Sequence, residues 1–444
     1  MNRPFDILIY GATGLAGKHV AKHFLKNHPE IKIAIAGRNQ AKLTKLVTDL
    51  NEPLGTATIT SDQILVASSD DAPELVQILS QAKVCIACAG PFRLMGKNIV
   101  EAAIQAQTDY LDLCGEPQFF DDMLTACDAQ ARDRNTLVIS ACAFDCVPAE
   151  MSYQFAAKEL VKKYKSSSVP VTNVEVVHTF SGIKCANSTT FHAAVDGFHA
   201  SYTGELKASR QKVKDTFPEL KNMKKKNKPS EWKKMISSPG MTSPLYHEFT
   251  KSYILKFMGA DAACILASDR YLRLRLSDEE VPTMPFFSVS FGLSQKSHAY
   301  TFLGFGAVFA TLAKWSWGCK ILHSNPELFT KGFFKDGGPT EEEMKDAKFS
   351  TSATAYGLTK DQCVKVKFSG GEPGYVATSA IMSALALTVL HHRDSMKFEG
   401  GVMLPGAAFS NCEKVYNILR QEGMQIDVVE NYEDRHDSEN DEKV

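Results

Sequence analysis

The stretch that decides the fold class lies near the start of the chain: Phe5-Asp6-Ile7-Leu8-Ile9-Tyr10-Gly11-Ala12-Thr13-Gly14-Leu15-Ala16-Gly17. A β-rich apolar run ends in glycines spaced Gly11-x-x-Gly14-x-x-Gly17, and an amphipathic helical pattern follows. Such a turn lets backbone N–H groups approach a pyrophosphate at the positive N-terminus of the helix. Because the glycines lie between a strand and a helix, they predict a dinucleotide-binding βαβ unit. A tight turn without a ligand is the alternative.

Strand and helix patterns alternate through the rest of the N-terminal third. The apolar runs typical of buried strands lie at 31–36, 64–67, 84–88, 110–113 and 137–140. The helical patterns between them lie at about 73–81, 96–107 and 118–134. Alternating strands and helices form βαβ units around a parallel sheet. We therefore predict an α/β fold with a Rossmann-type, doubly wound domain over residues 1–147.

The end of the second predicted strand indicates which cofactor binds. Gly37-Arg38 follows this strand, and no Asp or Glu is present there to bind the ribose 2′-hydroxyl of NAD. An arginine suits the 2′-phosphate of NADP, and Lys42 one turn later could assist. NADP(H) is therefore favoured over NAD(H), with a solvated arginine at a helix N-terminus as the alternative.

Small residues follow the fourth predicted strand, where a cofactor can pass close to the backbone. The cofactor-binding residues predicted from both loops are Gly11, Thr13, Gly14, Leu15, Ala16, Gly17, Arg38, Cys88, Ala89, Gly90 and Pro91. Cys85 and Cys88 match a CxxC spacing, but residues three apart in a strand face opposite sides. We expect both to be core thiols, and we predict no metal site.

Composition restricts the remaining function classes. The 444 residues carry 50 basic and 51 acidic side chains, a net charge of -1, so nothing indicates a nucleic-acid partner. Eleven cysteines, an odd number, favour reduced thiols over a disulfide framework. The N-terminus has no signal-peptide pattern, so we expect an intracellular, reducing compartment.

Further motifs follow one another along the chain. They are Ala36-Gly37-Arg38, Ala89-Gly90-Pro91-Phe92, Asp112-Leu113-Cys114-Gly115-Glu116-Pro117, Ala143-Phe144-Asp145-Cys146-Val147-Pro148, Gly259-Ala260-Asp261, Gly338-Pro339-Thr340, Gly374-Tyr375-Val376-Ala377-Thr378 and Leu404-Pro405-Gly406-Ala407-Ala408-Phe409. In this order, over about residues 4 to 429, the chain resembles the saccharopine dehydrogenase-like oxidoreductases, whose relatives include trans-acting enoyl reductases.

The resemblance implies a nicotinamide cofactor and an oxidoreductase. It also implies an α+β substrate or dimerisation domain, which we place at 148–372. Residues 373–430 are then expected to form a helix and a strand that pack back on the core. The acidic residues 431–444 lack apolar periodicity and predict a disordered tail.

No complete catalytic constellation is evident in the sequence. His178 and His192 are candidate acid–base groups because histidine titrates near neutral pH. Asp145 and Glu116 lie in loops just beyond predicted strand ends, where α/β sites form. Ordinary polar roles for the histidines and capping roles for the carboxylates are the alternatives.

An uncharged segment, 299–313, is followed by Lys314-Trp315-Ser316-Trp317. Its helix would span about 22 Å, less than the roughly 30 Å hydrocarbon core of a bilayer, so we do not expect it to cross a membrane. Tryptophan beside lysine is typical of a membrane interface, with a core helix or a homodimer contact as the alternatives. Between Lys207 and Lys234, eleven basic residues face three acidic ones, which suits either anionic lipid or a solvated loop.

Two C-terminal patterns are also informative. Residues 350–356 and 363–368 alternate around a turn and predict a hairpin with one solvated face. The apolar stretch 376–390 predicts a closely packed helix.

The leading hypothesis is an NADP(H)-dependent oxidoreductase that acts on an apolar or lipid-linked substrate, in the manner of an enoyl reductase. We expect it at the cytoplasmic face of a membrane or on a lipid droplet. The alternative is a lipid-surface scaffold that binds a dinucleotide without turnover. A true saccharopine dehydrogenase is expected least, because no cluster of basic residues is evident for a substrate with three carboxylates.

Overall fold

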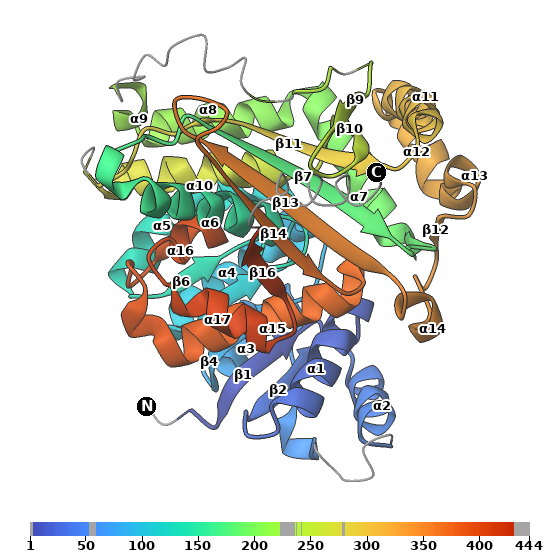
Figure 1. The fold of residues 1–444 in the computed structure, drawn as a ribbon. Helices are drawn as coiled ribbons and strands as arrows, with labels where there is room; N and C mark the ends of the chain where they lie inside the picture. Colours follow the sequence, from blue (N-terminus) through green and yellow to red (C-terminus); the bar gives the residue numbers. More distant parts are fainter. Residues whose placement is uncertain are drawn as a thin grey trace, which may run out of the picture.

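Two seven-stranded sheets organise the chain, together with a two-stranded pairing of β8 (Ala186–Asn187) and β12 (Phe334–Lys335) (Figure 1). The computed structural model describes residues 3–52, 59–222, 236, 238–240, 242–277 and 280–429. The densest part of the predicted basic stretch, 224–228, and the predicted acidic tail, 431–444, lie outside the described residues.

The first sheet is parallel throughout, in the order β15-β6-β5-β4-β1-β2-β3. Its strands are β1 (Phe5–Tyr10), β2 (Ile33–Gly37), β3 (Ile64–Val66), β4 (Ala82–Ala87), β5 (Asp109–Asp112), β6 (Leu137–Ile139) and β15 (Gly401–Met403). The helices that connect the first six strands are α1 (Leu15–Asn27), α2 (Gln40–Asn51), α3 (Ala72–Leu79), α4 (Phe92–Ala106) and α5 (Pro117–Asp133). The predicted Rossmann-type fold class is confirmed.

Local sequence explains where these elements begin and how they pack. Three consecutive residues of β1, Ile7, Leu8 and Ile9, are completely buried, as expected for a strand that is covered on both faces. Asn39 caps α2, since its side chain accepts a hydrogen bond from the Lys42 N–H at 2.9 Å. The buried face of α2 consists of Leu43, Leu46 and Leu50.

The second sheet is mixed, in the order β16-β14-β13-β7-β11-β10-β9. Its strands are β7 (Asn173–Ser181), β9 (Leu245–His247), β10 (Ser252–Lys256), β11 (Phe286–Leu293), β13 (Lys348–Tyr356), β14 (Cys363–Gly370) and β16 (Gln425–Val428). The β13–β14 hairpin confirms the prediction, because Val364, Val366 and Phe368 are buried while Lys367 is exposed.

The helices between β6 and β13 fall into two groups. α6 (Val147–Lys163) and α10 (Asp261–Arg275) share an apolar core with its strands. The remaining helices of the middle region are α7 (Ser188–Thr203), α8 (Glu205–Thr216), α9 (Glu219–Asn222), α11 (Lys296–Ala313), α12 (Ser316–Ser324), α13 (Pro326–Thr330) and α14 (Glu341–Met344). Figure 1 shows α11, α12 and α13 together at one side of the molecule.

The C-terminal segment returns to the first sheet. A π-helical turn, Pro373–Ala377, leads into α15 (Thr378–His392), and β15 pairs in parallel with β6 before α16 (Pro405–Ala408) and α17 (Lys414–Gln421). The sequence predicted one strand within 373–430, but neither its bounds nor its pairing partner. β16 then pairs with β14, so the last elements contribute to both sheets.

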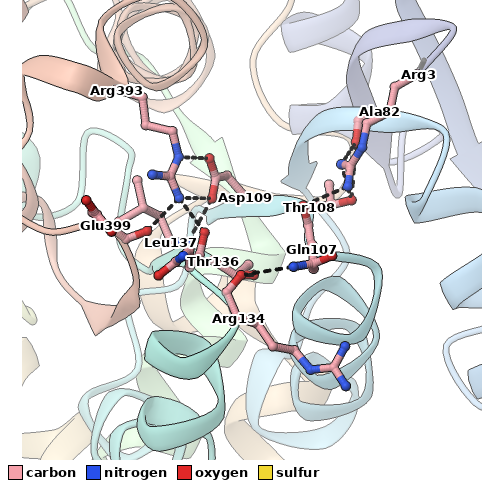
Figure 2. A network of polar contacts seen from close by, with 11 residues as sticks. Arg3, Ala82, Gln107, Thr108, Asp109, Arg134, Thr136, Leu137, Arg393 and Glu399 are labelled. Atoms are coloured by element: carbon pink, nitrogen blue, oxygen red, sulfur yellow. Dashed lines mark hydrogen bonds and ion pairs between the residues drawn. The ribbon is translucent and has the colours of Figure 1, made fainter. Parts of the chain in front are cut away.

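An ion pair holds the returning segment in place (Figure 2). The Arg393 guanidinium donates to both carboxylate oxygens of Asp109, at 2.7 and 3.2 Å. The same carboxylate accepts a hydrogen bond from the Leu137 N–H at 2.8 Å. Asp109 and Leu137 begin β5 and β6, so this contact lies at the edge of the sheet opposite the glycine turn.

One helical span among the described residues, Pro373–Ser395, is long and apolar enough to cross a membrane. Because 78% of its apolar window is buried inside the protein, it has the character of a core helix. This agrees with the prediction of a closely packed helix at 376–390.

Candidate functional site

Close packing explains why the first turn needs glycine. Gly11 has φ +78°, and a Cβ atom there would lie 2.7 Å from the Ala89 backbone nitrogen. A Cβ atom on Gly17 would lie 2.5 Å from the Gly11 carbonyl oxygen. The turn after β1 therefore packs directly on the loop after β4, which brings together the two segments predicted to bind the cofactor.

The N-terminus of α1 is suited to hold phosphate. Gly14 is the N-cap and provides no side chain to cap the helix, and the first turn contains no acidic residue. The backbone N–H groups of Leu15, Ala16 and Gly17 therefore combine with the positive end of the helix dipole. Thr13 precedes this cap, and Cys88, Ala89, Gly90 and Pro91 form the facing loop between β4 and α4. The residues present fit a dinucleotide pyrophosphate.

Arg38 lies directly after β2 and is exposed to solvent. Within the described ranges, it forms no ion pair with a protein carboxylate. Its position at the carboxyl end of β2 is where a Rossmann fold binds the ribose of the adenosine half. The guanidinium is thus available for an anionic group of a ligand.

A pair of carboxyl groups lies at the same edge of the sheet. Asp145 is in the loop after β6, and Asp261 is the first residue of α10. Their carboxyl groups lie close together, because ligand atoms of Asp145, Cys146 and Asp261 are within 4.8 Å of one another. Two carboxyl groups this close would repel each other if both were ionised. Desolvation of its carboxyl group, followed by the charge of Asp261, raises the pKa of Asp145 above its usual value. The Asp145 residue as a whole is exposed to solvent, whereas Asp261 is buried.

His178 completes this cluster from the second sheet. Its Nε2 lies 3.2 Å from Asp261 Oδ1, and its Nδ1 is 2.8 Å from the Thr351 hydroxyl. Nε2 is buried and makes no hydrogen bond within the described part of the chain. The structure thus brings Asp145 and His178 together through Asp261. Asp261 belongs to the motif Gly259-Ala260-Asp261, from which no role for this residue was predicted. The motif was the one sequence feature that could have pointed to it.

The other two predicted candidates lie elsewhere. His192 is on α7, and its Nε2 is 3.1 Å from the His323 carbonyl oxygen. Glu116 accepts a hydrogen bond from the Phe92 N–H at 3.0 Å and so caps α4, next to Arg93. Both contacts are structural, and neither side chain belongs to the acid pair.

Aromatic rings surround His178. The ring centroids of Phe257, Phe144 and Phe180 lie 5.1, 6.4 and 6.5 Å from the imidazole. Phe180 is partly exposed, so this aromatic wall reaches the surface beside the acid pair. Across the described ranges, neither Asp145 nor Asp261 forms an ion pair with a lysine or arginine. Among the residues that the structure describes, the acid pair thus has an imidazole, aromatic rings and thiols beside it and no lysine or arginine paired with it.

Two thiols lie behind the acid pair. Cys146 and Cys264 are buried, with their sulfur atoms 2.7 Å apart. Ligand atoms of Asp145, Cys146 and Asp261 lie within 4.8 Å of one another, close enough to hold a metal ion. Burial raises the pKa of Cys146 well above its usual value, so the thiol stays protonated in the metal-free protein. We interpret the two carboxyl groups as the functional part of this group. All eleven cysteines are free, as expected for Cys85 and Cys88.

The predicted interfacial segment forms an exposed apolar surface. We call it the α11–α13 surface; its side chains are 37% to 75% exposed and comprise Tyr300, Phe302, Phe305, Val308, Trp315, Trp317, Ile321, Leu328 and Phe333. Phe309 faces inward, against Phe191 and Phe198. The alternative of a core helix is wrong for the exposed face, because most of α11 is not covered by the chain.

Comparison with known proteins agrees with this geometry. Residues 7–139 match the model of the saccharopine dehydrogenase NADP-binding domain. The saccharopine dehydrogenase-like oxidoreductase of Rattus norvegicus is 26% identical, over 97% of this chain and 99% of the relative. The chain is similar to the saccharopine dehydrogenase-like oxidoreductases over nearly its full length. The resemblance inferred from the sequence motifs is thereby confirmed.

Other proteins that are similar to this chain carry different names. A Caenorhabditis elegans protein named "lipid droplet localized protein" is 26% identical over 97% of this chain and 99% of its own length. A Mycobacterium tuberculosis protein named as a trans-acting enoyl reductase is 34% identical over 40% of this chain and 41% of its own length. The solved saccharopine dehydrogenase (L-Glu forming) of Saccharomyces cerevisiae shares the fold, with a TM-score of 0.52, 12% identity and coverage of 96% of this chain and 100% of that chain.

Proposed function

We propose that this protein is an NADP(H)-dependent oxidoreductase that reduces an apolar or lipid-linked substrate at a lipid surface. The acid pair carries the proposal. Asp145 and Asp261 lie close together at the carboxyl edge of the parallel sheet, the edge on which Rossmann folds bind their ligands, and there they would share a proton. A carboxyl group that stays protonated near neutral pH is what a reductase needs beside its substrate.

The cofactor would be held by residues already described. The N–H groups at the start of α1 would bind the pyrophosphate, and Arg38 the 2′-phosphate that distinguishes NADP from NAD. When bound, NADPH supplies a hydride to the substrate. The small residues Ala89 and Gly90 leave space for the cofactor to pass along the carboxyl edge of the sheet.

The chain's own contribution is the proton. As hydride reaches one carbon of a polarised double bond, the acid pair donates its shared proton to the neighbouring atom. Solvent returns the proton through Asp145, a residue that as a whole is exposed. His178 is a positioning residue, because it contacts Asp261 at 3.2 Å and is held by Thr351.

The aromatic wall supports an apolar substrate. Phe144, Phe180 and Phe257 favour a hydrocarbon near the reacting atom, as in an unsaturated acyl group. A substrate with three carboxylates would need cationic partners. The acid pair has none in the part of the chain that the structure describes, which disfavours a true saccharopine dehydrogenase. The partial similarity to a protein named as an enoyl reductase supports the same substrate class.

The α11–α13 surface supports attachment to a lipid surface. Four exposed lysines, Lys296, Lys314, Lys320 and Lys331, accompany its aromatic side chains, whereas Glu327 is the one acidic residue within 296–333. Lysine heads beside exposed rings suit anionic headgroups above an acyl boundary. A relative named for its place on lipid droplets is consistent with this attachment. A second copy of the chain is the alternative occupant of the surface.

Turnover distinguishes the enzyme from a scaffold that only binds the dinucleotide. We would measure NADPH consumption with a long-chain trans-2-enoyl ester in mixed micelles. Asp145→Asn should lower kcat by about 10² to 10⁴ and leave NADPH affinity unchanged, because the proposed role of this carboxyl is proton transfer to the substrate and not cofactor binding. Cys146→Ser, on the neighbouring residue, should retain activity. NADPH binding without consumption would favour the scaffold, and full activity of Asp145→Asn would exclude the acid pair as proton donor.

A further inference from the structure

A second cluster of ligating side chains lies far from the acid pair. His23 is on α1 and His28 follows the end of that helix, while Glu422 ends α17. His23 Nε2 lies 2.5 Å from Glu422 Oε2, and His28 Nε2 lies 2.7 Å from Glu422 Oε1. One carboxylate thus holds both imidazoles, although residues 23 and 422 are 399 positions apart in sequence.

We propose that His23, His28 and Glu422 bind a divalent transition-metal ion, with zinc as the preferred metal. The three ligand atoms lie within 4.8 Å of one another, so small rotations of the imidazoles would place a cation between them. Two imidazoles and one carboxylate form a known zinc ligand set, in which water occupies the remaining position. The side chains are partly accessible, at 15% and 17% exposure for the histidines, so a hydrated ion can reach them.

The surroundings of the cluster match those of a metal site. His28 Nδ1 lies 3.4 Å from Glu30 Oε1, on the side of the ring away from Glu422. A ligating imidazole commonly directs its other nitrogen to a carboxylate, which fixes the tautomer and increases the basicity of the ligating nitrogen. The Glu422 side chain is only 4% exposed, so its carboxylate is confined facing the two imidazoles.

The position of the cluster indicates what the metal would do. His23 and His28 lie at the C-terminal end of α1, whereas the cofactor's phosphates are expected at its N-terminus. The ion would therefore join α1 of the first sheet to α17, whose following strand β16 belongs to the second sheet. The metal ion would thus crosslink the N-terminal and C-terminal parts of the chain. Its role would be structural and separate from hydride transfer.

Metal binding can be tested on the full chain with metal alone as the probe. The protein would be stripped with a chelator, dialysed and titrated with Zn²⁺ by calorimetry, and with Co²⁺ by visible absorption. We expect one equivalent to bind, a Co²⁺ spectrum typical of mixed nitrogen and oxygen ligands, and a rise in Tm on metal addition. Glu422→Gln should weaken binding by more than about 100-fold, the upper end of what loss of an outer partner costs.

Two matched variants serve as controls. Glu30→Gln should weaken metal binding about 10-fold, because Glu30 supports a ligand without being one. His298→Gln removes an exposed histidine outside the cluster and should bind metal like the unmodified protein. NADPH affinity, measured without metal, checks that every variant is folded. No saturable binding by the unmodified protein, or equal binding by Glu422→Gln, would overturn the proposal and leave the cluster as hydrogen bonds.

Discussion

Attachment through the α11–α13 surface can be tested by removing its exposed apolar groups. We would replace Phe305, Val308 and Trp317 together with serine. Their side chains are 41%, 51% and 58% exposed, so about half of each would leave water on docking. Complete burial of an apolar side chain of this size contributes about 1.5–3 kcal/mol. The three half-exposed groups together contribute roughly 2–4 kcal/mol, which corresponds to about a 30- to 700-fold loss of vesicle affinity.

Flotation with vesicles is the assay. The unmodified protein should float with vesicles that contain anionic lipid, and the triple variant should remain at the bottom of the gradient. High salt should weaken binding to anionic vesicles, since the lysines act through screened charges, and should spare the apolar contribution. Leu358→Ser is the matched control, because Leu358 is 50% exposed in the turn between β13 and β14.

The choice of residues keeps folding separate from docking. Phe309 is left intact because its ring packs 5.2 Å from Phe198 and 5.5 Å from Phe191. The triple variant should therefore bind NADPH normally. Equal flotation of the triple variant, or an unmodified protein that stays in solution, would refute the lipid surface. A dimer in light scattering that the triple variant loses would instead assign the surface to a second copy.

Four further predictions concern the cofactor, the proton, the substrate and stability. Arg38→Ala should lower the preference for NADPH over NADH by about ten- to hundred-fold. Gly14→Val should weaken the binding of both cofactors, because its side chain crowds the pyrophosphate. Equal binding of NADPH and NADH by the unmodified protein would contradict the assignment. Because the pKa of Asp145 is raised, the reduction rate should fall as pH rises through that pKa if this carboxyl is the proton donor; a rate that rises there would argue for a base. Saccharopine should give no measurable oxidation with NADP or NAD, and robust turnover would reverse the ranking of substrates. Arg393→Ala should lower the free energy of unfolding, measured in urea, by about 1.5–3 kcal/mol, because it leaves the largely buried Asp109 carboxylate without the Arg393 guanidinium. An unchanged midpoint of urea unfolding would show that the ion pair contributes little.

Sequence reasoning succeeded where the signal was local. The glycine spacing and the apolar runs each lie within a few residues, and each predicted its element in the right place. The partner of Asp145 could not be found this way. Asp261 lies on a different element far along the chain, and only the packing of α10 against the loop after β6 brings the two carboxyl groups together.

The sequence left the exposure of α11 open between alternatives, and it gave the strand expected within 373–430 neither bounds nor partner. The two have different reasons. An uncharged helix has the same composition whether it lies in a core or on a surface, so exposure of Val308 could be decided only by what packs around it. Gly401–Met403 is too short to stand out as a strand, and its pairing with β6 depends on a chain reversal that no local pattern encodes. His23 and Glu422 lie near opposite ends of the sequence, with nothing between them to suggest contact.

The pairing of β15 with β6 also determines when the protein can fold. During synthesis, the first six strands emerge early, but β6 keeps an unpaired edge until residues 401–403 have left the ribosome. A nascent chain with such an edge is exposed to aggregation for most of its translation time. We therefore expect that the nucleotide-binding third of the chain does not fold on its own. A fragment cut after residue 147 would lack its last strand and the helix α15 that covers the sheet, and should be recovered in soluble form only with the C-terminal segment added in trans.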